Sequence, residues 1–468
     1  MTRIKFGTDG WRAIIAKDFT VDNVARVAVA TAEWLKRSHL PKKVVIGYDC
    51  RFGGKMFAET VATVLAHDGL EVLLSEKEVT TPMVSLAVMK KEAGLGVIIT
   101  ASHNPPEYNG FKLKGSYGGP LLPEKVEEIE ALIQEEHGLQ LDDLSLEKFK
   151  QEGLIKLIDL ETMYCDHVAA NFDLDAIRKS GLKIAYDAMY GAGQDAVKRL
   201  LPDATRMHCE KNPSFYGVAP EPIHKNLQPF SDLIAESGNF AFGFATDGDA
   251  DRIGVYDAKG RFVDSHHVIL LLIKYLFEQK NFKGTVCTAF STSVRIGKLC
   301  KHFGLENKVV KIGFKYICGV MLKEDVLLGG EESGGIAIKG HIPERDGIWI
   351  GLTILEYMVK TGKTLAQLID DVYAIVGPFA YERADLHINE KLKEKVIASC
   401  RGNDIRKFGD FAVSKMEDLD GFKFFIGDDE WLMIRPSGTE PVLRTYAESS
   451  TSERAREILK AGYDTLIA

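Results

Sequence analysis

The sequence predicts an α/β protein of repeated units, and three observations carry this prediction. Segments with apolar residues at helical spacing alternate with short β-branched runs, the order typical of helices that cover a mostly parallel sheet. The strand-like run KVVIGYD (43–49) is echoed by LKIAYD (182–187), which indicates weak internal repetition. Residues 377–468 differ, because their apolar residues alternate as in an antiparallel sheet before a terminal helix. We therefore predict three similar mixed α/β domains followed by a C-terminal α+β domain.

The predicted elements follow one another regularly along the chain. In the first unit, helices are expected over 23–38, 57–68 and 82–91, and strands over 43–49, 71–74 and 97–99. The charged segment 124–152 is expected to be helical and to lead, with 160–172, into the second unit. Later strands are expected over 182–187, 240–247, 285–289 and 326–328. The expected domains cover residues 1–155, 156–258, 259–374 and 375–468.

Length and composition restrict the class of protein. At 468 residues the chain exceeds what one hydrophobic core usually organises, and 45% hydrophobic residues fit globular folding. No stretch approaches the roughly 18 uninterrupted apolar residues of a membrane span, and the start MTRIKFGTDGWR lacks the apolar region of a signal peptide. Seven scattered cysteines without CxxC spacing fit a reducing compartment and no zinc site. The net charge of −8 argues against a nucleic-acid partner, and together these features predict a cytoplasmic protein without nucleic-acid or membrane partners.

Ser102 stands in a polar loop that opens where a buried strand stops. The run 97–99 is apolar and β-branched, and Asn104-Pro105-Pro106 prevents a helix from starting directly after the serine. Open parallel sheets bind ligands outside the carboxyl ends of their strands. We therefore interpret Ser102 as a residue placed for chemistry, and the alternative is a polar turn whose serine only satisfies backbone donors.

The motif DGDADR at 247–252 predicts a cation site. Asp247, Asp249 and Asp251 alternate along a turning backbone, so their carboxylates can converge, and hard oxygen ligands imply magnesium. An EF-hand is excluded, because Arg252 stands where its turn glycine belongs and Ala258 where its bidentate glutamate belongs. The alternative is a solvated acidic turn, in which three carboxylates would repel one another.

Two glycine-containing loops offer polar groups to an anion or a sugar. The loop 435–441 (RPSGTEP) places a guanidinium, two hydroxyls and a glycine after a strand, a combination that can hold a phosphate. Glu331 and Ser333, flanked by glycines, offer an acceptor and a hydroxyl suited to vicinal sugar hydroxyls. An ordinary loop is the alternative for both.

Three further patterns indicate functions that we do not favour. Residues 191–196 resemble a dinucleotide fingerprint, but no acidic strand end stands where a ribose ligand is needed. Gly362-Lys363-Thr364 resembles the end of a P-loop, but Tyr357 replaces its first glycine. Ser102 lacks the G-x-S-x-G elbow, which argues against a serine hydrolase.

Taken together and in this order, four motifs resemble those of the α-D-phosphohexomutases, a family that includes phosphoglucomutase and phosphomannomutase. They are TASHNP around Ser102, DGDADR at 247–252, GEESGG at 330–335 and RPSGTEP at 435–441. The resemblance covers nearly the whole chain, with one motif in each unit. It implies four domains around a central cleft, a phosphorylated serine, one Mg²⁺ ion and a bisphosphorylated sugar intermediate.

The resemblance also implies a role for each matching position. Ser102 would carry the phosphoryl group and, with Asp247, Asp249 and Asp251, hold the metal. The basic groups beside the serine would be Arg12, His103 and Lys112. The groups that bind the sugar or its distal phosphate would be Glu331, Ser333, Lys315, Arg435, Ser437, Gly438 and Thr439. Arg252 would be a further cation of the cleft, and His341 would face substrate or cap a turn.

The expected reaction is the interconversion of glucose 1-phosphate and glucose 6-phosphate, with Mg²⁺ as cofactor and glucose 1,6-bisphosphate as activator. Glu332 and Gly335, at the variable positions of the sugar loop, favour glucose, with mannose phosphates as additional candidates. The alternatives are a glucosamine or pentose phosphate mutase, or a sugar-phosphate-binding protein without catalysis. The expected partners are small hexose phosphates, and the expected assembly is a monomer or a dimer.

Overall fold

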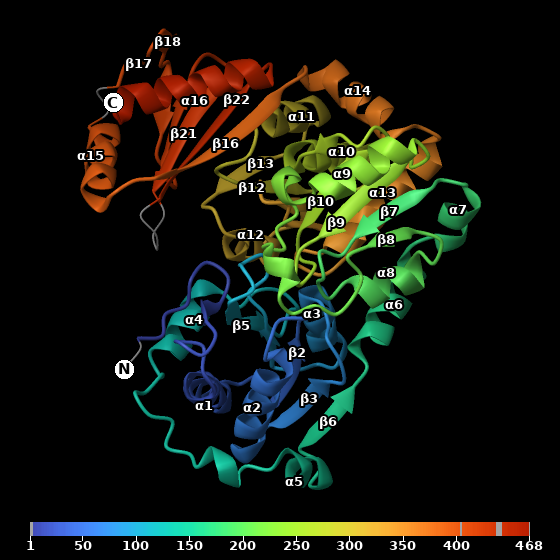
Figure 1. Cartoon of the computed structure of the whole chain (residues 1–468), viewed down its shortest axis with the longest axis vertical. Coiled ribbons are helices and arrows are strands. Elements are labelled where there is room, and N and C mark those ends of the chain that lie inside the picture. The colour runs from blue at the N-terminus through green and yellow to red at the C-terminus, as the bar shows by residue number, and fades with distance from the viewer. Residues whose placement is uncertain (1–2, 403–404, 437–441, 468) are drawn as a thin grey trace.

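The structure, a computed structural model, describes residues 3–402, 405–436 and 442–467. Four units, each built on its own main sheet, follow one another from the blue N-terminal unit to the red C-terminal unit in Figure 1. This arrangement confirms the predicted fold class, three mixed α/β units and a C-terminal α+β unit. No helix in the described part of the chain is both long and apolar enough to cross a membrane.

The first unit is a six-stranded sheet in the order β1-β5-β4-β2-β3-β6. Its strands are β1 (Trp11–Ile14), β2 (Lys43–Tyr48), β3 (Glu71–Ser75), β4 (Leu95–Ile99), β5 (Tyr108–Gly115) and β6 (Ile155–Ile158). Its helices are α1 (Val21–Arg37), α2 (Gly54–His67), α3 (Thr81–Lys90), α4 (Pro123–Glu130) and α5 (Leu146–Gln151). The strands β4, β2, β3 and β6 run parallel, whereas β5 is antiparallel to both of its neighbours.

The segment 124–152 is helical only at its two ends, which corrects the sequence-based expectation. Between α4 and α5 the chain forms one short 3-10 turn, Leu141–Asp143, and Gly138 adopts a φ of 70°. In α4 and α5, Ile129 and Phe149 are the buried side chains. Glycine has a low helix propensity, and Gly138 adopts a left-handed conformation in the middle of the segment, so one continuous helix does not form.

The second and third units repeat the mixed arrangement. The second sheet has the order β11-β10-β9-β7-β8, and the third has the order β13-β12-β14-β15. The strands are β7 (Ile184–Asp187), β8 (Thr205–Met207), β9 (Phe242–Thr246), β10 (Ile253–Asp257), β11 (Phe262–Val263), β12 (Thr285–Ala289), β13 (Asn307–Val310), β14 (Val326–Gly330) and β15 (Ile336–Ile338). The helices are α6 (Leu160–Asn171), α7 (Leu174–Lys179), α8 (Gln194–Leu200), α9 (Gln228–Ser237), α10 (Ser265–Glu278), α11 (Arg295–Phe303), α12 (Phe314–Met321), α13 (Gly347–Thr361) and α14 (Leu365–Val376).

The same antiparallel hairpin occurs in each of these three sheets, and each hairpin encloses one of the polar loops. The hairpin β4–β5 encloses the Ser102 loop, β9–β10 encloses 247–252, and β14–β15 encloses 331–335. We call these the serine, aspartate and glutamate hairpins. The weak sequence repetition thus corresponds to a repeated structural device that presents a loop at one end of a sheet.

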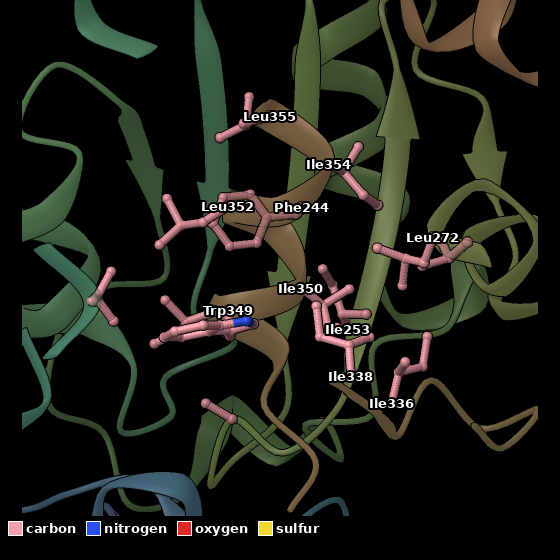
Figure 2. Close-up of a cluster of buried hydrophobic side chains, with 14 of the residues drawn as sticks. Phe244, Ile253, Leu272, Ile336, Ile338, Trp349, Ile350, Leu352, Ile354 and Leu355 are labelled. Carbon is pink, nitrogen blue, oxygen red and sulfur yellow. The ribbon is translucent and has the colours of Figure 1, made fainter. Parts of the chain in front are cut away.

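A continuous apolar core joins the second and third units. Helix α13 of the third unit packs on β9 and β10 of the second sheet. Figure 2 shows side chains of α13 such as Ile350 and Leu352 beside Phe244 of β9 and Ile253 of β10. At Gly351 a Cβ atom would lie 2.9 Å from the Phe244 ring, so the helix and the sheet approach closely. This packing fixes the aspartate and glutamate hairpins relative to each other.

The fourth unit is an antiparallel sheet in the order β16-β22-β21-β20-β19, with a small hairpin β17–β18. Its strands are β16 (Ala380–His387), β17 (Lys407–Phe408), β18 (Phe411–Ala412), β19 (Lys415–Glu417), β20 (Phe422–Phe425), β21 (Trp431–Pro436) and β22 (Val442–Ser449). Its helices are α15 (Glu390–Arg401) and α16 (Ser452–Leu466). The antiparallel sheet and the terminal helix confirm the α+β prediction.

Candidate active site

The serine hairpin presents Ser102 to the aspartate hairpin. Ser102 is 1% exposed, and its Oγ donates a hydrogen bond of 2.5 Å to Oδ2 of Asp247. Its φ of 52° lies in the left-handed region, which a non-glycine residue keeps only where its surroundings hold it there. Ser102 therefore lies just beyond the carboxyl end of β4, with its hydroxyl directed at the neighbouring unit.

The aspartate hairpin brings three buried carboxylates together. Asp247, Asp249 and Asp251 each offer an oxygen within 4.8 Å of the others, and all three residues are 0% exposed. Ala250, with a φ of 55°, turns the chain between them. Burial and the charges of Asp249 and Asp251 raise the pKa of Asp247 well above its ordinary value. Added positive charge next to these three aspartates, the aspartate trio, would therefore lower the free energy of the folded protein.

Two cations from the flanking units offset part of this negative charge. Nζ of Lys112, on β5, lies 2.8 Å from Oδ2 of Asp249 and 3.1 Å from Oδ2 of Asp251. Arg345, which follows β15, donates to Oδ2 of Asp251 at 2.5 Å. Both cations also contact Oδ2 of Asp9, at 2.8 Å and 2.7 Å. Although burial lowers the pKa of Lys112, these carboxylates raise it above its ordinary value, so the ammonium stays charged.

The present partners of the three aspartates leave some of the carboxylate oxygens unpaired. Oδ1 of Asp249 and Oδ1 of Asp251 are buried without a hydrogen-bond partner. Buried polar atoms are nearly always paired, so such oxygens call for a ligand. Hard carboxylate oxygens at this spacing suit Mg²⁺. Asp247, Asp249 and Asp251 can therefore hold the ion that the sequence predicts.

Arg12 and His103 lie beside the serine, at the edge of the aspartate trio. Nη1 of Arg12, on β1, donates to Oδ1 of Asn104 at 2.6 Å, and Nδ1 of His103 lies 3.4 Å from Oγ of Ser102. Burial, together with the charges of Arg252 and Arg12, lowers the pKa of His103 well below its ordinary value. The imidazole is therefore neutral near pH 7 and can accept a proton.

The glutamate hairpin reaches the same site through Arg345. The guanidinium of Arg345 lies 3.5 Å from Oε2 of Glu331. Burial raises the pKa of Glu331 to about 7. The loop packs on the aspartate hairpin, because the backbone N–H of Ile253 donates to the carbonyl of Gly334 at 3.1 Å. Ser333 is half-buried in this loop.

Arg252 and Lys315 have different surroundings. The backbone N–H of Arg252 donates to Oδ1 of Asp247 at 3.1 Å, and its guanidinium lies 3.8 Å from Glu221. Lys315, at the start of α12, donates to the carbonyl of Gly7 at 3.3 Å, so it lies on the N-terminal segment. Arg252 therefore belongs to the aspartate hairpin, whereas Lys315 links the third unit to the first.

The fourth motif is described only at its start. Arg435, on β21, pairs with Asp420 at 3.2 Å, whereas Ser437, Gly438 and Thr439 lie outside the described residues. His341 packs with its ring 3.8 Å from that of Trp349 and bonds Asp346 at 2.9 Å, away from the aspartate trio. The structure thus brings three of the four predicted loops together.

Sequence reasoning missed several residues that contact these loops. Asp9 bridges Lys112 and Arg345, and Thr81 donates to Oδ2 of Asp249 at 2.5 Å. Arg51 is buried beneath the serine loop. A signal existed for some of them, because FGTDGWR and YDCR each place an acid and an arginine in a glycine-containing or strand-end segment. Thr81, at the start of α3, carries no such signal.

Family models match nearly the whole chain in four consecutive segments. They are described as Phosphoglucomutase/phosphomannomutase, alpha/beta/alpha domain I over residues 3–139, domain II over 162–260, domain III over 264–376 and C-terminal domain over 388–464.

Individual proteins match over the same length. A protein of Thermococcus kodakarensis named phosphoglucomutase/phosphomannomutase is 29% identical over 466 residues, with 98% of each chain covered. A phosphoglucosamine mutase of Limosilactobacillus reuteri is 30% identical, with 97% of this chain and 96% of that protein covered. The crystal structure of a "putative phosphomannomutase" from Thermus thermophilus superimposes with a TM-score of 0.87 at 34% identity, over 100% of both chains.

Proposed function

Because this chain belongs to the α-D-phosphohexomutase family, whose members are phosphotransferase mutases, we propose that it interconverts glucose 1-phosphate and glucose 6-phosphate through a phosphorylated Ser102. Glucose 1,6-bisphosphate would be both the intermediate and the activator, and mannose phosphates are additional candidate substrates. We likewise propose that the domain boundaries lie at residues 155, 258 and 374.

One observation supports this proposal above the others. A buried serine hydroxyl lies 2.5 Å from a carboxylate of a trio that two cations from other units already contact. Phosphoryl transfer depends mainly on alignment and on stabilising the charge of the transferred group. A phosphoserine bears about two negative charges near pH 7, so beside this acidic trio it needs the two cations and the further positive charge that a divalent ion would supply.

The side chains of this site divide the work of a phosphoryl transfer. Ser102 receives the phosphoryl group from the bisphosphate and gives it to the incoming sugar hydroxyl. Neutral His103, 3.4 Å from the serine Oγ, accepts the proton of the attacking sugar hydroxyl and returns it to the serine Oγ as the Oγ–P bond breaks. Lys112 and Arg12 stabilise the charge on the transferred oxygens. A Mg²⁺ ion on the three aspartates would supply further positive charge to the phosphoryl oxygens.

The remaining predicted residues would bind the sugar and its second phosphate. Glu331 and Ser333 would accept and donate hydrogen bonds to sugar hydroxyls, with Arg252 and Lys315 as further cations. Arg435, Ser437, Gly438 and Thr439 would hold the phosphate that is not reacting. The fourth unit contacts the loop of the glutamate hairpin, because the guanidinium of Arg383 on β16 lies 3.8 Å from the carboxylate of Glu332.

A direct assay tests the proposal. Purified protein with Mg²⁺ and glucose 1,6-bisphosphate is expected to convert glucose 1-phosphate, and isotope from labelled bisphosphate is expected to appear on Ser102. Ser102→Ala is expected to abolish both signals, whereas Ser291→Ala, at a buried serine of the third unit, leaves them intact. Turnover by Ser102→Ala at the wild-type rate would refute the phosphoserine role.

A glucosamine phosphate is the second candidate substrate, because several relatives near 30% identity are named phosphoglucosamine mutases. Comparison of kcat/KM for the 1-phosphates of glucose, mannose and glucosamine decides between them. A glucosamine 1-phosphate value above the other two would replace glucose as the assigned substrate.

A further inference from the structure

The backbone of Ser102 is held by side chains rather than by sheet hydrogen bonds. Its N–H donates to Oγ1 of Thr100 at 2.9 Å, and its carbonyl accepts a hydrogen bond of 2.6 Å from Nη2 of Arg51. Both backbone polar groups of the residue are therefore satisfied by neighbouring side chains. This matters because Ser102 has a φ of 52°, a left-handed conformation that is unfavourable for an L-residue and persists only where its surroundings hold it.

Arg51 binds the serine loop with every N–H of its two terminal nitrogens. Nη1 donates to the carbonyls of Pro105 at 2.8 Å and Tyr108 at 3.0 Å. Nη2 donates to the carbonyls of Ser102 at 2.6 Å and Asn104 at 2.5 Å. A planar guanidinium can reach four acceptors in fixed directions, whereas a lysine ammonium has three donors on one nitrogen.

Arg51 is itself fixed from both sides. It is 3% exposed, and its Nε lies 3.5 Å from Oδ2 of Asp49. The same oxygen of Asp49 accepts the hydroxyl of Thr100 at 2.5 Å, so one carboxylate supports both groups that hold Ser102. On the other side, the ring of Phe215 covers the guanidinium, with its centroid 5.0 Å from Cζ of Arg51. Phe215 belongs to the second unit.

We propose that Arg51 is a positioning residue for phosphoryl transfer, which keeps the Ser102 hydroxyl directed at the aspartate hairpin. Through Phe215, this positioning depends on the docking of the second unit, which also carries the aspartates. The four hydrogen bonds of its terminal nitrogens all end on backbone carbonyls, so Arg51 acts through the loop backbone. The inference rests on the proposed function of Ser102.

The test compares two Arg→Lys variants of the full-length protein. Arg51→Lys keeps the charge but leaves loop carbonyls without their donors, whereas Arg26→Lys is the matched control. Arg26 is a buried arginine of the same unit, 8% exposed, and its Nε donates to the carbonyl of Gln134 at 2.7 Å. Steady-state kinetics with glucose 1-phosphate, thermal melting and the rate of label transfer from glucose 1,6-bisphosphate to Ser102 are measured for both.

Arg51→Lys is expected to lower kcat and the labelling rate roughly 100-fold, the loss typical of a misplaced reacting group, while KM changes by less than about threefold. Arg26→Lys is expected to keep the wild-type kcat. Equal kcat values for the two variants, or a rise in KM at unchanged kcat, would overturn the inference.

A second variant tests the inference if Arg51→Lys fails to fold. Phe215→Leu removes the aromatic cover supplied by the second unit, keeps an apolar side chain at this buried position and leaves the arginine in place. It is expected to lower kcat and the labelling rate several-fold at unchanged KM, and wild-type kinetics in a folded Phe215→Leu protein would contradict the proposal. If the wild-type enzyme itself shows neither turnover nor label on Ser102, the proposed function fails, and the role of Arg51 fails with it.

Discussion

Nζ of Lys112 lies 2.8 Å from Oδ2 of Asp249, although 137 residues separate the two in the chain. The lysine belongs to the first unit and the aspartate to the second, and their side chains are 1% and 0% exposed. A charged pair removed from water in this way depends on its geometry, because neither partner can be rehydrated when the other is lost. Contacts between the units therefore have measurable consequences for stability and activity.

Replacement of Lys112 by Met is expected to lower the free energy of unfolding by about 3–5 kcal/mol, because it removes the ammonium that pairs with the buried carboxylate of Asp249 and leaves Asp251 with Arg345 alone. Urea denaturation measures this change, and the mutase assay is expected to show loss of activity. Lys36→Met is the control, since Lys36 pairs with Asp68 at the surface and such pairs contribute about 1 kcal/mol or less. A Lys112→Met protein as stable as the control would show that the pair is not needed.

Mg²⁺ is expected to stabilise the wild-type protein against heat by binding the aspartate trio. At a free concentration about 100 times its dissociation constant, a ligand adds about 2.7 kcal/mol to the free energy of unfolding. Asp249→Asn is expected to lose most of this gain, because it removes a ligand charge. Asp173→Asn, at an exposed helix cap where Asn serves equally well, is expected to keep it. An identical Mg²⁺ response in both variants would place the ion elsewhere.

Gly191→Ala is expected to impair activity by displacing the aspartate hairpin. A Cβ atom at this position would lie 2.6 Å from the carbonyl oxygen of Asp247 and 2.9 Å from Cα of Gly248, and neither backbone atom can move without shifting the loop. Gly319→Ala is the matched control, because its Cβ would meet only the Leu122 side chain at an ordinary 3.7 Å. The mutase assay measures the difference, and wild-type kcat in Gly191→Ala would disprove the close approach.

The stability of the protein is expected to fall in mild acid through His266. Nδ1 of this buried ring accepts the backbone N–H of Ser293 at 3.1 Å, which requires the unprotonated atom, and burial lowers the pKa to about 4. Between the ordinary value of 6.5 and about 4, the unfolded chain binds the proton and the folded chain does not. The contribution of His266 to the free energy of unfolding is therefore complete above pH 6.5. It decreases as the pH falls towards 4, by on the order of 3 kcal/mol in total.

Urea denaturation at about pH 7 and about pH 5 measures this effect. His266→Asn replaces the ring by an amide that can accept the same hydrogen bond without titrating. Between these two pH values, the variant is therefore expected to lose less free energy of unfolding than the wild type. His302→Asn, at an exposed position of α11, serves as the control and is expected to follow the wild type. Parallel losses in all three proteins would exclude His266 as the source.

The parts of the fold and site that the sequence predicts are those encoded locally. Strand periodicity indicates the three repeated units, and short polar loops after strands make Ser102 and the three aspartates candidate site residues. These loops carry their residue types within a few positions of each other. Convergence of the serine and aspartate hairpins agrees with that expectation, while the catalytic roles of their residues stay predictions.

The parts that the sequence does not predict depend on contacts between units. Arg345 reaches Asp251 across 94 residues, and Arg51 reaches the carbonyl of Ser102 across 51. Both arginines act on residues that are distant in the chain, and a single sequence does not show which distant residues pair. The helix predicted over 124–152 was wrong for a different reason: its charged residues have good helix propensity, but Gly138 interrupts the segment in a left-handed conformation.

The position of Arg345 has a consequence for protein synthesis. A ribosome delivers Asp251 well before Arg345, so early in translation the acidic trio can meet Lys112 of the first unit but not Arg345. The full set of ion pairs around the trio therefore forms only once the chain beyond the third sheet has emerged. A prematurely terminated product that ends before Arg345 keeps the serine and all three aspartates, yet its acidic loop lacks the guanidinium that balances it.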